Sequence, residues 1–190
     1  MDVEDVVKRR MFLATLTSAS LGAFSQGSFD AIGRTQNNRQ TGAGPRGGAP
    51  SDTTHVEVTG NAVFIRRYGS GPAILLVHGF PRTSLMWRFL APQLAENHTV
   101  ICVDLRSYGR SGIPASTADH SPYSKRVMAN ELVEVMAKLG FQKFTLIGHD
   151  RGGRVSYRLA LDHPNTVERL AVFDVIPIYE AWSRTDARFA

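Results

Sequence analysis

The chain has 190 residues, which is enough for one domain with a substantial core. Its composition, 43% hydrophobic and 21% charged, is that of a globular protein and argues against disorder along the whole chain. The net charge is +5, but the basic residues form no cluster dense enough for nucleic acid, so we expect a solvated surface and no nucleic-acid partner. The single cysteine, Cys102, excludes an intramolecular disulfide.

Residues 1–25 have the features of a twin-arginine export signal. Arg9 and Arg10 are followed by Phe12, Leu13 and a mildly apolar run. This run is shorter than the roughly 20 residues that span a bilayer, so we expect no stable membrane anchor. A frayed amphipathic terminus or an over-extended start of translation is the alternative, since no clear A-x-A cleavage site follows. The signal predicts a periplasmic location, and the alternative a cytoplasmic one.

Residues 26–52 are rich in Gly, Asn, Gln, Arg and Pro, and we predict a flexible linker there. Residues 53–190 then alternate between strands and helices. A hairpin is expected over 56–58 and 62–68, and buried strands over 73–77, 99–103, 144–147 and 170–173. Helices are expected over about 84–94 and 124–139, and a third helix after the strand 144–147 that ends at about 162. This order predicts right-handed crossovers and a mostly parallel sheet flanked by helices.

The stretch 144–154 has the pattern of a nucleophile elbow. An apolar, β-branched run is followed by a polar residue between glycines and then by a helix-compatible run. Gly148 and Gly152 allow the backbone to turn tightly. The residue at the tip is Asp150, and a carboxylate can attack a carbon without a base and form an ester on the enzyme. The carboxyl ends of parallel strands are also where such sheets place their chemistry.

Four separated motifs carry a family resemblance: 78–81 with 86–87, 104–106 with 108–111, 148–154, and 174–177. Over roughly residues 53–182 they resemble the α/β-hydrolase fold, and within it the haloacetate (fluoroacetate) dehalogenases. Epoxide hydrolases and haloalkane dehalogenases are more distant relatives. Ser107 departs from the pattern, because the family usually has glycine there.

The resemblance implies a role for each matched residue. Asp150 would displace halide from a short haloacid, and the backbone N–H groups of Phe80 and Arg151 would form the oxyanion hole. Arg151 and Arg154 would hold the substrate carboxylate through paired hydrogen bonds. Asp174 matches the acid that orients the water-activating histidine. Haloalkane dehalogenases and most epoxide hydrolases have Trp at position 151, so Arg151 favours an anionic substrate.

In the family that histidine comes near the C-terminus, after a helical cap and two more strands. We therefore expect the N-terminal part of the fold, lacking its C-terminal strands and cap, with an unpaired sheet edge at 170–173 and poor stability. The functional hypotheses are haloacetate dehalogenase, epoxide hydrolase, and a catalytically incomplete fragment or non-enzymatic remnant. The expected partner is a small carboxylate substrate, a homodimer is allowed, and no cofactor or metal is predicted.

Overall fold

A computed structural model of the chain describes residues 11–12 and 48–176. The predicted export signal and most of the predicted linker lie outside these residues, apart from 11–12 and the segment from Gly48 onward. The folded region begins with a strand at Asp52, one residue before the predicted start.

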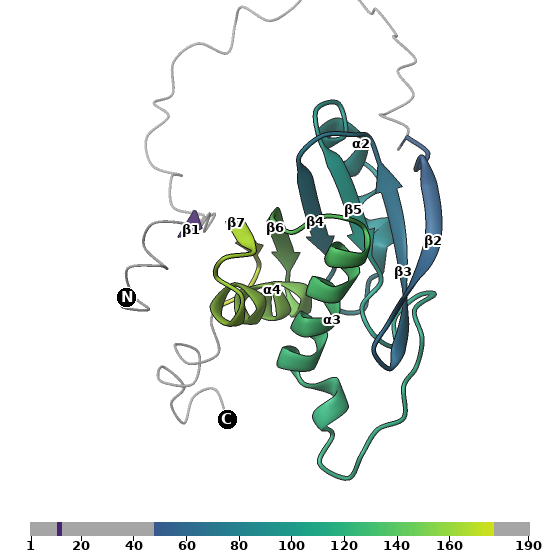
Figure 1. The fold of residues 1–190 in the computed structure, drawn as a ribbon, viewed down its shortest axis with the longest axis vertical. Helices are drawn as coiled ribbons and strands as arrows, with labels where there is room; N and C mark the ends of the chain where they lie inside the picture. The colour runs from purple at the N-terminus through teal and green to yellow at the C-terminus, as the bar shows by residue number, and fades with distance from the viewer. Residues whose placement is uncertain (1–10, 13–47, 177–190) are drawn as a thin grey trace, which may run out of the picture.

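The described residues form a seven-stranded sheet in the order β1-β7-β6-β4-β5-β3-β2. Pairs β2–β3 and β3–β5 are antiparallel, and all other neighbouring strands are parallel (Figure 1). The predicted mostly parallel α/β sheet is therefore confirmed. The strands are β1 Met11–Phe12, β2 Asp52–Val58, β3 Asn61–Tyr68, β4 Ala73–Val77, β5 Thr99–Val103, β6 Phe144–His149 and β7 Val167–Phe173.

The helices are few and short, except for two that cross the sheet. Helix α3 spans Lys125–Lys138 and α4 spans Arg151–Asp162, and both lie on the same face of the sheet (Figure 1). The hydroxyl of Ser124 caps α3 by accepting a hydrogen bond from the N–H of Val127 at 3.3 Å. The shorter elements are the 3-10 helices η1 Ser84–Trp87 and η2 Ser121–Tyr123 and the helix α2 Ala91–Leu94.

The core follows directly from the central strands, which are buried on both faces. Leu75 and Val77 of β4 face α3 and α4, together with Leu132 and Leu159 of those helices. Their neighbours in the same strand, such as Leu76, face a second cluster that contains Trp87 of η1. Alternating side chains of an all-apolar strand thus fill two separate cores, as expected for a central parallel strand.

Two predicted features differ from the structure. The helix expected over about 84–94 is divided into η1 and α2. Pro92 has no N–H to donate to a preceding turn, so an unbroken helix would lose a hydrogen bond there. The sheet edge is also not fully unpaired, because Met11 pairs with Leu170 and Phe12 with Ala171 in parallel register. Within the described part of the chain, no helix is long and apolar enough to cross a membrane.

Candidate active site

The backbone turns directly from β6 into α4 at a single residue. Strand β6 ends at His149, helix α4 begins at Arg151, and Asp150 between them has φ 45° and ψ −114°. A side chain at positive φ is uncommon outside glycine and is maintained only where the surroundings enforce it. The structure thus places Asp150 at the tip of the strand–turn–helix unit that the sequence predicts.

Two glycines bring the backbone segments of this elbow together. A Cβ on Gly152 would lie 2.4 Å from the carbonyl oxygens of both Val77 and His78, at the end of β4. A Cβ on Gly148 would lie 2.4 Å from the hydroxyl oxygen of Ser156 on α4. No larger residue fits at either position without moving β4 or α4, so the glycines are required for close helix–strand packing.

The carboxylate of Asp150 is held by backbone N–H groups. The N–H of Phe80 donates to Oδ2 at 2.8 Å. Burial alone raises the pKa of Asp150, but the backbone hydrogen bonds from Phe80 and Arg151 oppose it, aided by the charges of His149 and Arg154. The net result is a pKa below the ordinary aspartate value, so the group is ionised at neutral pH.

Two arginines follow Asp150 within the first turn of α4. The guanidinium carbon of Arg151 lies 5.8 Å from the ring centroids of both Phe80 and Tyr108, within the range of a cation–π contact. Arg154 is exposed, and its charge reaches Asp150. Neither arginine forms an ion pair with an acidic side chain in the part of the chain that the structure describes.

Asp174 follows the last residue of β7 and lies at the same sheet edge as Asp150. The N–H of Asp150 donates to the carbonyl of Phe173 at 3.0 Å, which joins the two strand ends. The Asp174 side chain is 83% exposed and contacts the ring of His149, with Nε2 and Oδ2 3.6 Å apart. The other ring nitrogen of His149 is buried without a hydrogen-bond partner. The sequence did not predict this histidine contact.

His78, which follows β4, is a structural tether. The N–H of Leu105 donates to its Nε2 at 2.9 Å, so Nδ1 carries the proton and donates to the carbonyl of Gly79 at 2.9 Å. Burial lowers the pKa of His78 and keeps it neutral. The ring also packs edge-on against Tyr108. His78 thereby positions the 79–81 loop, including the N–H of Phe80, over the elbow.

Asp104, which follows β5, has both carboxylate oxygens occupied by loop backbone. Oδ1 accepts from the N–H of Ser84 at 2.6 Å, and Oδ2 accepts from the N–H of Arg110 at 2.9 Å. The residue is 2% exposed. Asp104 therefore shapes the loops beside the elbow.

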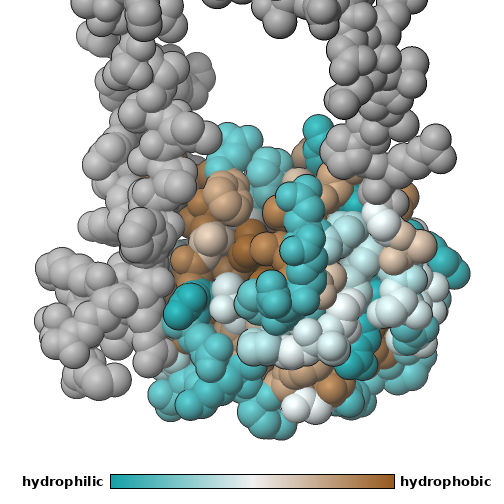
Figure 2. Space-filling view, turned by 90° about the horizontal axis from the view of Figure 1, so that it is seen from above, coloured by the Kyte–Doolittle hydropathy of each residue, from teal (hydrophilic) through white to brown (hydrophobic). Residues whose placement is uncertain are grey.

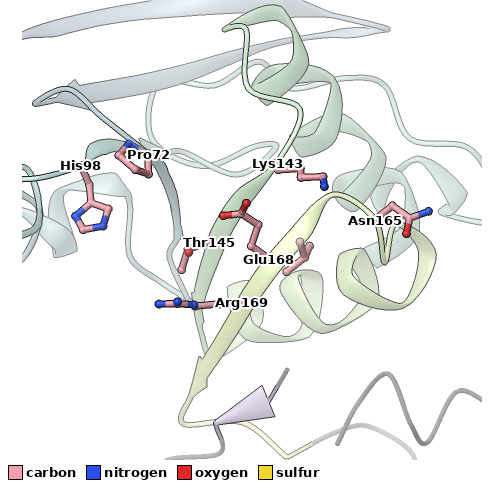
Figure 3. Close-up of a pocket in the computed structure, with 8 residues that line it drawn as sticks. Pro72, His98, Lys143, Thr145, Asn165, Glu168 and Arg169 are labelled. Carbon is pink, nitrogen blue, oxygen red and sulfur yellow. The ribbon is translucent and has the colours of Figure 1, made fainter. Parts of the chain in front are cut away.

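A large cavity lies at the other end of the strands. It measures about 670 Å³ and lies beside the first residues of β6 and β7, with Thr145 and Glu168 in its lining (Figure 3). The other lining residues are Pro72, His98, Lys143, Asn165, Val167 and Arg169. These residues lie at the amino ends of the parallel strands, so the cavity is separate from the edge that carries Asp150. No cluster of His, Cys, Asp and Glu suited to a metal ion occurs among the described residues.

Comparisons with known proteins agree with this architecture. Residues 72–186 match the family of the alpha/beta hydrolase fold. A fluoroacetate dehalogenase from Burkholderia sp is 53% identical over 118 residues, covering 62% of this chain and 39% of that protein. A soluble epoxide hydrolase from Corynebacterium sp. (strain C12) is 40% identical over 128 residues, covering 64% of this chain and 43% of that protein.

Solved structures give the same result. ALR0039 from Nostoc sp PCC 7120, assigned to the alpha/beta hydrolases, is 49% identical with a TM-score of 0.71, covering 73% of this chain and 48% of that one. A mutant of a Vigna radiata epoxide hydrolase is 28% identical with a TM-score of 0.63, and the match covers 67% of this chain and 39% of that one. The chain thus spans less than half the length of these relatives. The fold, the elbow and the matched region together show that this chain belongs to the α/β-hydrolase fold family.

Proposed function

We propose that this chain carries the nucleophile and substrate-carboxylate site of a haloacetate dehalogenase-like hydrolase. Its relatives are hydrolases, and the first of those named above is a fluoroacetate dehalogenase. The observation that carries the proposal is the position of the Asp150 carboxylate, with one oxygen held by the N–H of Phe80 and no base required for ionisation.

The proposed first step is a displacement at the α-carbon of the haloacid. Oδ1 of Asp150 attacks that carbon, the new O–C bond forms, and the carbon–halogen bond breaks. The halide leaves with the bonding electron pair, and the product is an ester on Asp150. The oxygen bound by Phe80 then becomes the carbonyl oxygen of the ester.

The second step is hydrolysis of that ester. Water adds to the carbonyl carbon, negative charge develops on Oδ2, and the N–H groups of Phe80 and Arg151 are placed to stabilise it. Collapse of this intermediate breaks the bond between the carbonyl carbon and Oδ1, releases a hydroxyacid and restores the carboxylate. In the proposal Asp174, at the neighbouring strand end, orients the base that activates the water.

The proposed substrate is a small monocarboxylate. Arg151 and Arg154 follow Asp150 in the first turn of α4, and their guanidinium groups have no acidic ion-pair partner among the described residues, so they are available to a substrate carboxylate. Guanidinium binds a carboxylate through two parallel hydrogen bonds, which fixes the α-carbon relative to the nucleophile. Epoxide hydrolysis is the second candidate, because several relatives are epoxide hydrolases and their ring opening would use the same ester.

The test is to trap the ester. The chain is incubated with chloroacetate or bromoacetate, its intact mass is measured, and the modified residue is mapped by peptide mass spectrometry, while released halide is measured in parallel. Cys102 is buried and burial raises the pKa of its thiol, so it should not compete.

We expect halide release and a carboxymethyl ester on Asp150, and neither in Asp150→Asn, which keeps the size of the side chain. Equal halide release by Asp150→Asn would refute the nucleophile assignment. An adduct formed with styrene oxide, in the absence of one with haloacetates, would favour the epoxide candidate.

A further inference from the structure

Arg151 is held in the structure by two aromatic rings. Its guanidinium carbon lies 5.8 Å from the ring centroid of Phe80 and 5.8 Å from that of Tyr108. Both distances are within the roughly 6 Å at which the face of a ring attracts a cation. The two rings come from different loops, one after β4 and the other after β5, so residues far apart in the sequence meet at this side chain.

Other arginines of the neighbouring helices are held by carboxylates. Arg126 of α3 and Arg158 of α4 both pair with Asp162, which compensates their charge. A carboxylate at Arg151 would compete with the carboxylate of a substrate, because both need the same N–H donors. An aromatic ring attracts the guanidinium without neutralising it. The surroundings of Arg151 therefore suit an arginine that is held in place and still binds an anion.

The ring of Tyr108 is fixed by the loop that follows β5. The N–H of Tyr108 donates to the carbonyl of Leu105 at 2.9 Å, and its carbonyl accepts from the N–H of Ser111 at 3.0 Å. Ser111 is itself buried, and its hydroxyl donates to the carbonyl of Asp104 at 2.6 Å. The Tyr108 side chain is half-buried against the core. Tyr108 thus offers Arg151 a surface whose position the fold determines.

The same ring contacts the residue that positions the 79–81 loop. The ring centroids of Tyr108 and His78 are 5.1 Å apart, and the planes meet at 64°, the edge-on arrangement that aromatic pairs favour. Tyr108 therefore touches both the tether of the Phe80 loop and the guanidinium of Arg151. These contacts are made by the ring, so they do not depend on the phenolic hydroxyl.

We infer that Tyr108 is a positioning residue, whose ring, together with that of Phe80, orients the Arg151 guanidinium for a substrate carboxylate. The inference deepens the proposed function and rests on it. A free arginine side chain loses rotamer freedom when it binds a ligand, and a guanidinium already held between two rings loses less. Tyr108 acts through Arg151 and does not touch the reacting carbon, so its effect should be limited to anionic substrates.

Binding is tested apart from chemistry, in an Asp150→Asn background where no ester forms. Chloroacetate and chloroacetamide have similar size and differ in charge, and calorimetry at low ionic strength gives their dissociation constants. Tyr108→Leu should raise the constant of chloroacetate about three- to five-fold and leave that of chloroacetamide unchanged. Tyr108→Phe keeps the ring and should retain most of the affinity. Phe141→Leu is the matched control, because it removes a ring 6.0 Å from the guanidinium of Arg67, and it should change neither constant.

The other ring provides a second variant. Phe80→Leu keeps the backbone N–H that binds Asp150 and should weaken chloroacetate binding as Tyr108→Leu does. Phe80 is 62% exposed, so this variant should fold even if Tyr108→Leu does not.

A double-mutant cycle shows whether the ring acts through the arginine. With Asp150 intact, the rate of its esterification by bromoacetate is measured below saturation. Tyr108→Leu should lower this rate but not the rate with bromoacetamide, and it should have no further effect in a chain that already carries Arg151→Met. An equal loss with both reagents, or an equal loss in the Arg151→Met chain, would mean that the ring acts elsewhere and would overturn the inference.

The outcomes for the inference and for the proposed function are distinguishable. Unchanged chloroacetate binding in a folded Tyr108→Leu variant would overturn the inference even if Asp150 forms its ester. If Tyr108→Leu does not fold, unchanged binding in Phe80→Leu would overturn it. Absence of any Asp150 ester, together with chloroacetate binding that depends on the Tyr108 ring, would instead overturn the proposed function and retain the ring-held arginine as an anion site.

Discussion

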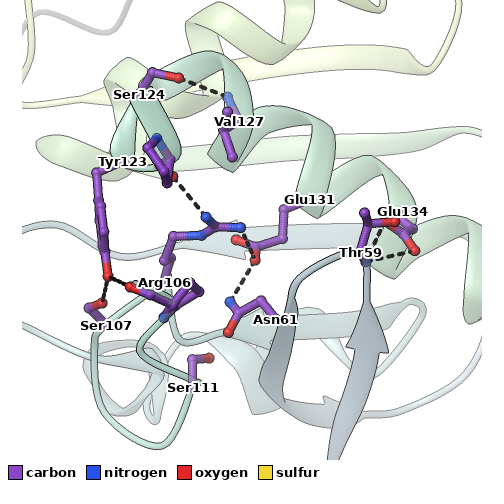
Figure 4. Close-up of polar contacts among 12 residues, drawn as sticks. Thr59, Asn61, Arg106, Ser107, Ser111, Tyr123, Ser124, Val127, Glu131 and Glu134 are labelled. Atoms are coloured by element: carbon purple, nitrogen blue, oxygen red, sulfur yellow. Dashed lines mark hydrogen bonds and ion pairs between the residues drawn. The ribbon is translucent and has the colours of Figure 1, made fainter. Parts of the chain in front are cut away.

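Replacing Glu131 by alanine should destabilise the chain more than any other single charge removal on α3. Glu131 is buried, and its Oε1 accepts from Nη2 of Arg106 at 3.0 Å and from Nδ2 of Asn61 at 2.6 Å (Figure 4). The side chains of Glu131 and Arg106 are 3% and 5% exposed. Solvent therefore cannot replace the lost carboxylate.

The magnitude follows from what remains in the Glu131→Ala variant. Arg106 keeps the hydrogen bond from Nη1 to the carbonyl of Pro122 at 2.8 Å, but its Nε already has no partner. Its charge would then be buried and uncompensated, which costs about 3–5 kcal/mol. That is a large fraction of the roughly 5–15 kcal/mol that stabilises a typical domain. The loop that carries Tyr108 would also lose its attachment to α3.

The matched control is Glu134→Ala, three residues further along the same helix. Glu134 pairs with Lys138 and accepts from the N–H of Thr59, but its side chain is 31% exposed (Figure 4). An exposed pair of this kind is worth about 0–1 kcal/mol. Urea unfolding followed by tryptophan fluorescence would measure both variants, since Trp87 lies in the core.

The reasoning would be refuted if Glu131→Ala cost less than about 1 kcal/mol, or no more than Glu134→Ala. A double replacement, Arg106→Met with Glu131→Leu, provides a further check. It removes both charges and fills the space with apolar atoms, so it should recover most of the stability lost in the single variant.

Three further predictions concern the backbone and the nucleophile. Gly152→Ala should lower the free energy of unfolding, measured with urea, by about 1–3 kcal/mol, because the added Cβ would meet two backbone oxygens at 2.4 Å. An alanine variant as stable as the wild type would refute the close packing. Ser107→Gly should raise the thermal midpoint, because Ser107 has φ 64° and glycine adopts that conformation without the roughly 1 kcal/mol penalty of a side chain. Tyr123→Phe removes the hydrogen bonds of the Tyr123 hydroxyl to Ser107 and to the carbonyl of Pro114 without relieving the strain, so it should not raise the midpoint. The rate of Asp150 esterification should stay constant from about pH 8 to 5 and fall only below about 4. The reason is that the pKa of Asp150 is depressed, so the reactive carboxylate is lost only as the pH falls through that lower pKa. A midpoint of the pH–rate profile above about 5 would contradict this expectation.

Much of the fold could be predicted from the sequence because its central strands are unambiguous. The run 73–77 is entirely apolar and β-branched or leucine-rich, and so is most of 99–103. A strand of that kind is stable only between two layers, which selects a parallel α/β sheet. The elbow could also be predicted, because Gly148 and Gly152 lie on either side of the polar residue Asp150 at the end of a strand.

Features that depend on contacts distant in sequence could not be predicted. The contact between His149 and Asp174 depends on the parallel register of β6 and β7, in which His149 lies opposite Phe173. The pairing of Met11–Phe12 with β7 joins segments more than 150 residues apart.

Several large apolar side chains are exposed in and just after the loop that carries Phe80. Phe80 is 62% exposed beside Asp150, and Leu85, Phe89 and Leu90 of the following segment are also exposed. Apolar side chains also gather on the face drawn in Figure 2, where hydrophilic residues border them.

Backbone strain in the described residues is concentrated where the proposed chemistry lies. Besides His120, the non-glycine residues with positive φ are Ser107, Asp150 and Asp174, which follow β5, β6 and β7 respectively. Each such residue costs free energy locally, and the buried strands behind it supply the packing that holds it in place. A carboxylate restrained in this way needs little reorganisation before the proposed attack, because its orientation is already set by the backbone N–H groups of Phe80 and Arg151. The same strands that stabilise the fold therefore also maintain the strained geometry that the proposed reaction requires.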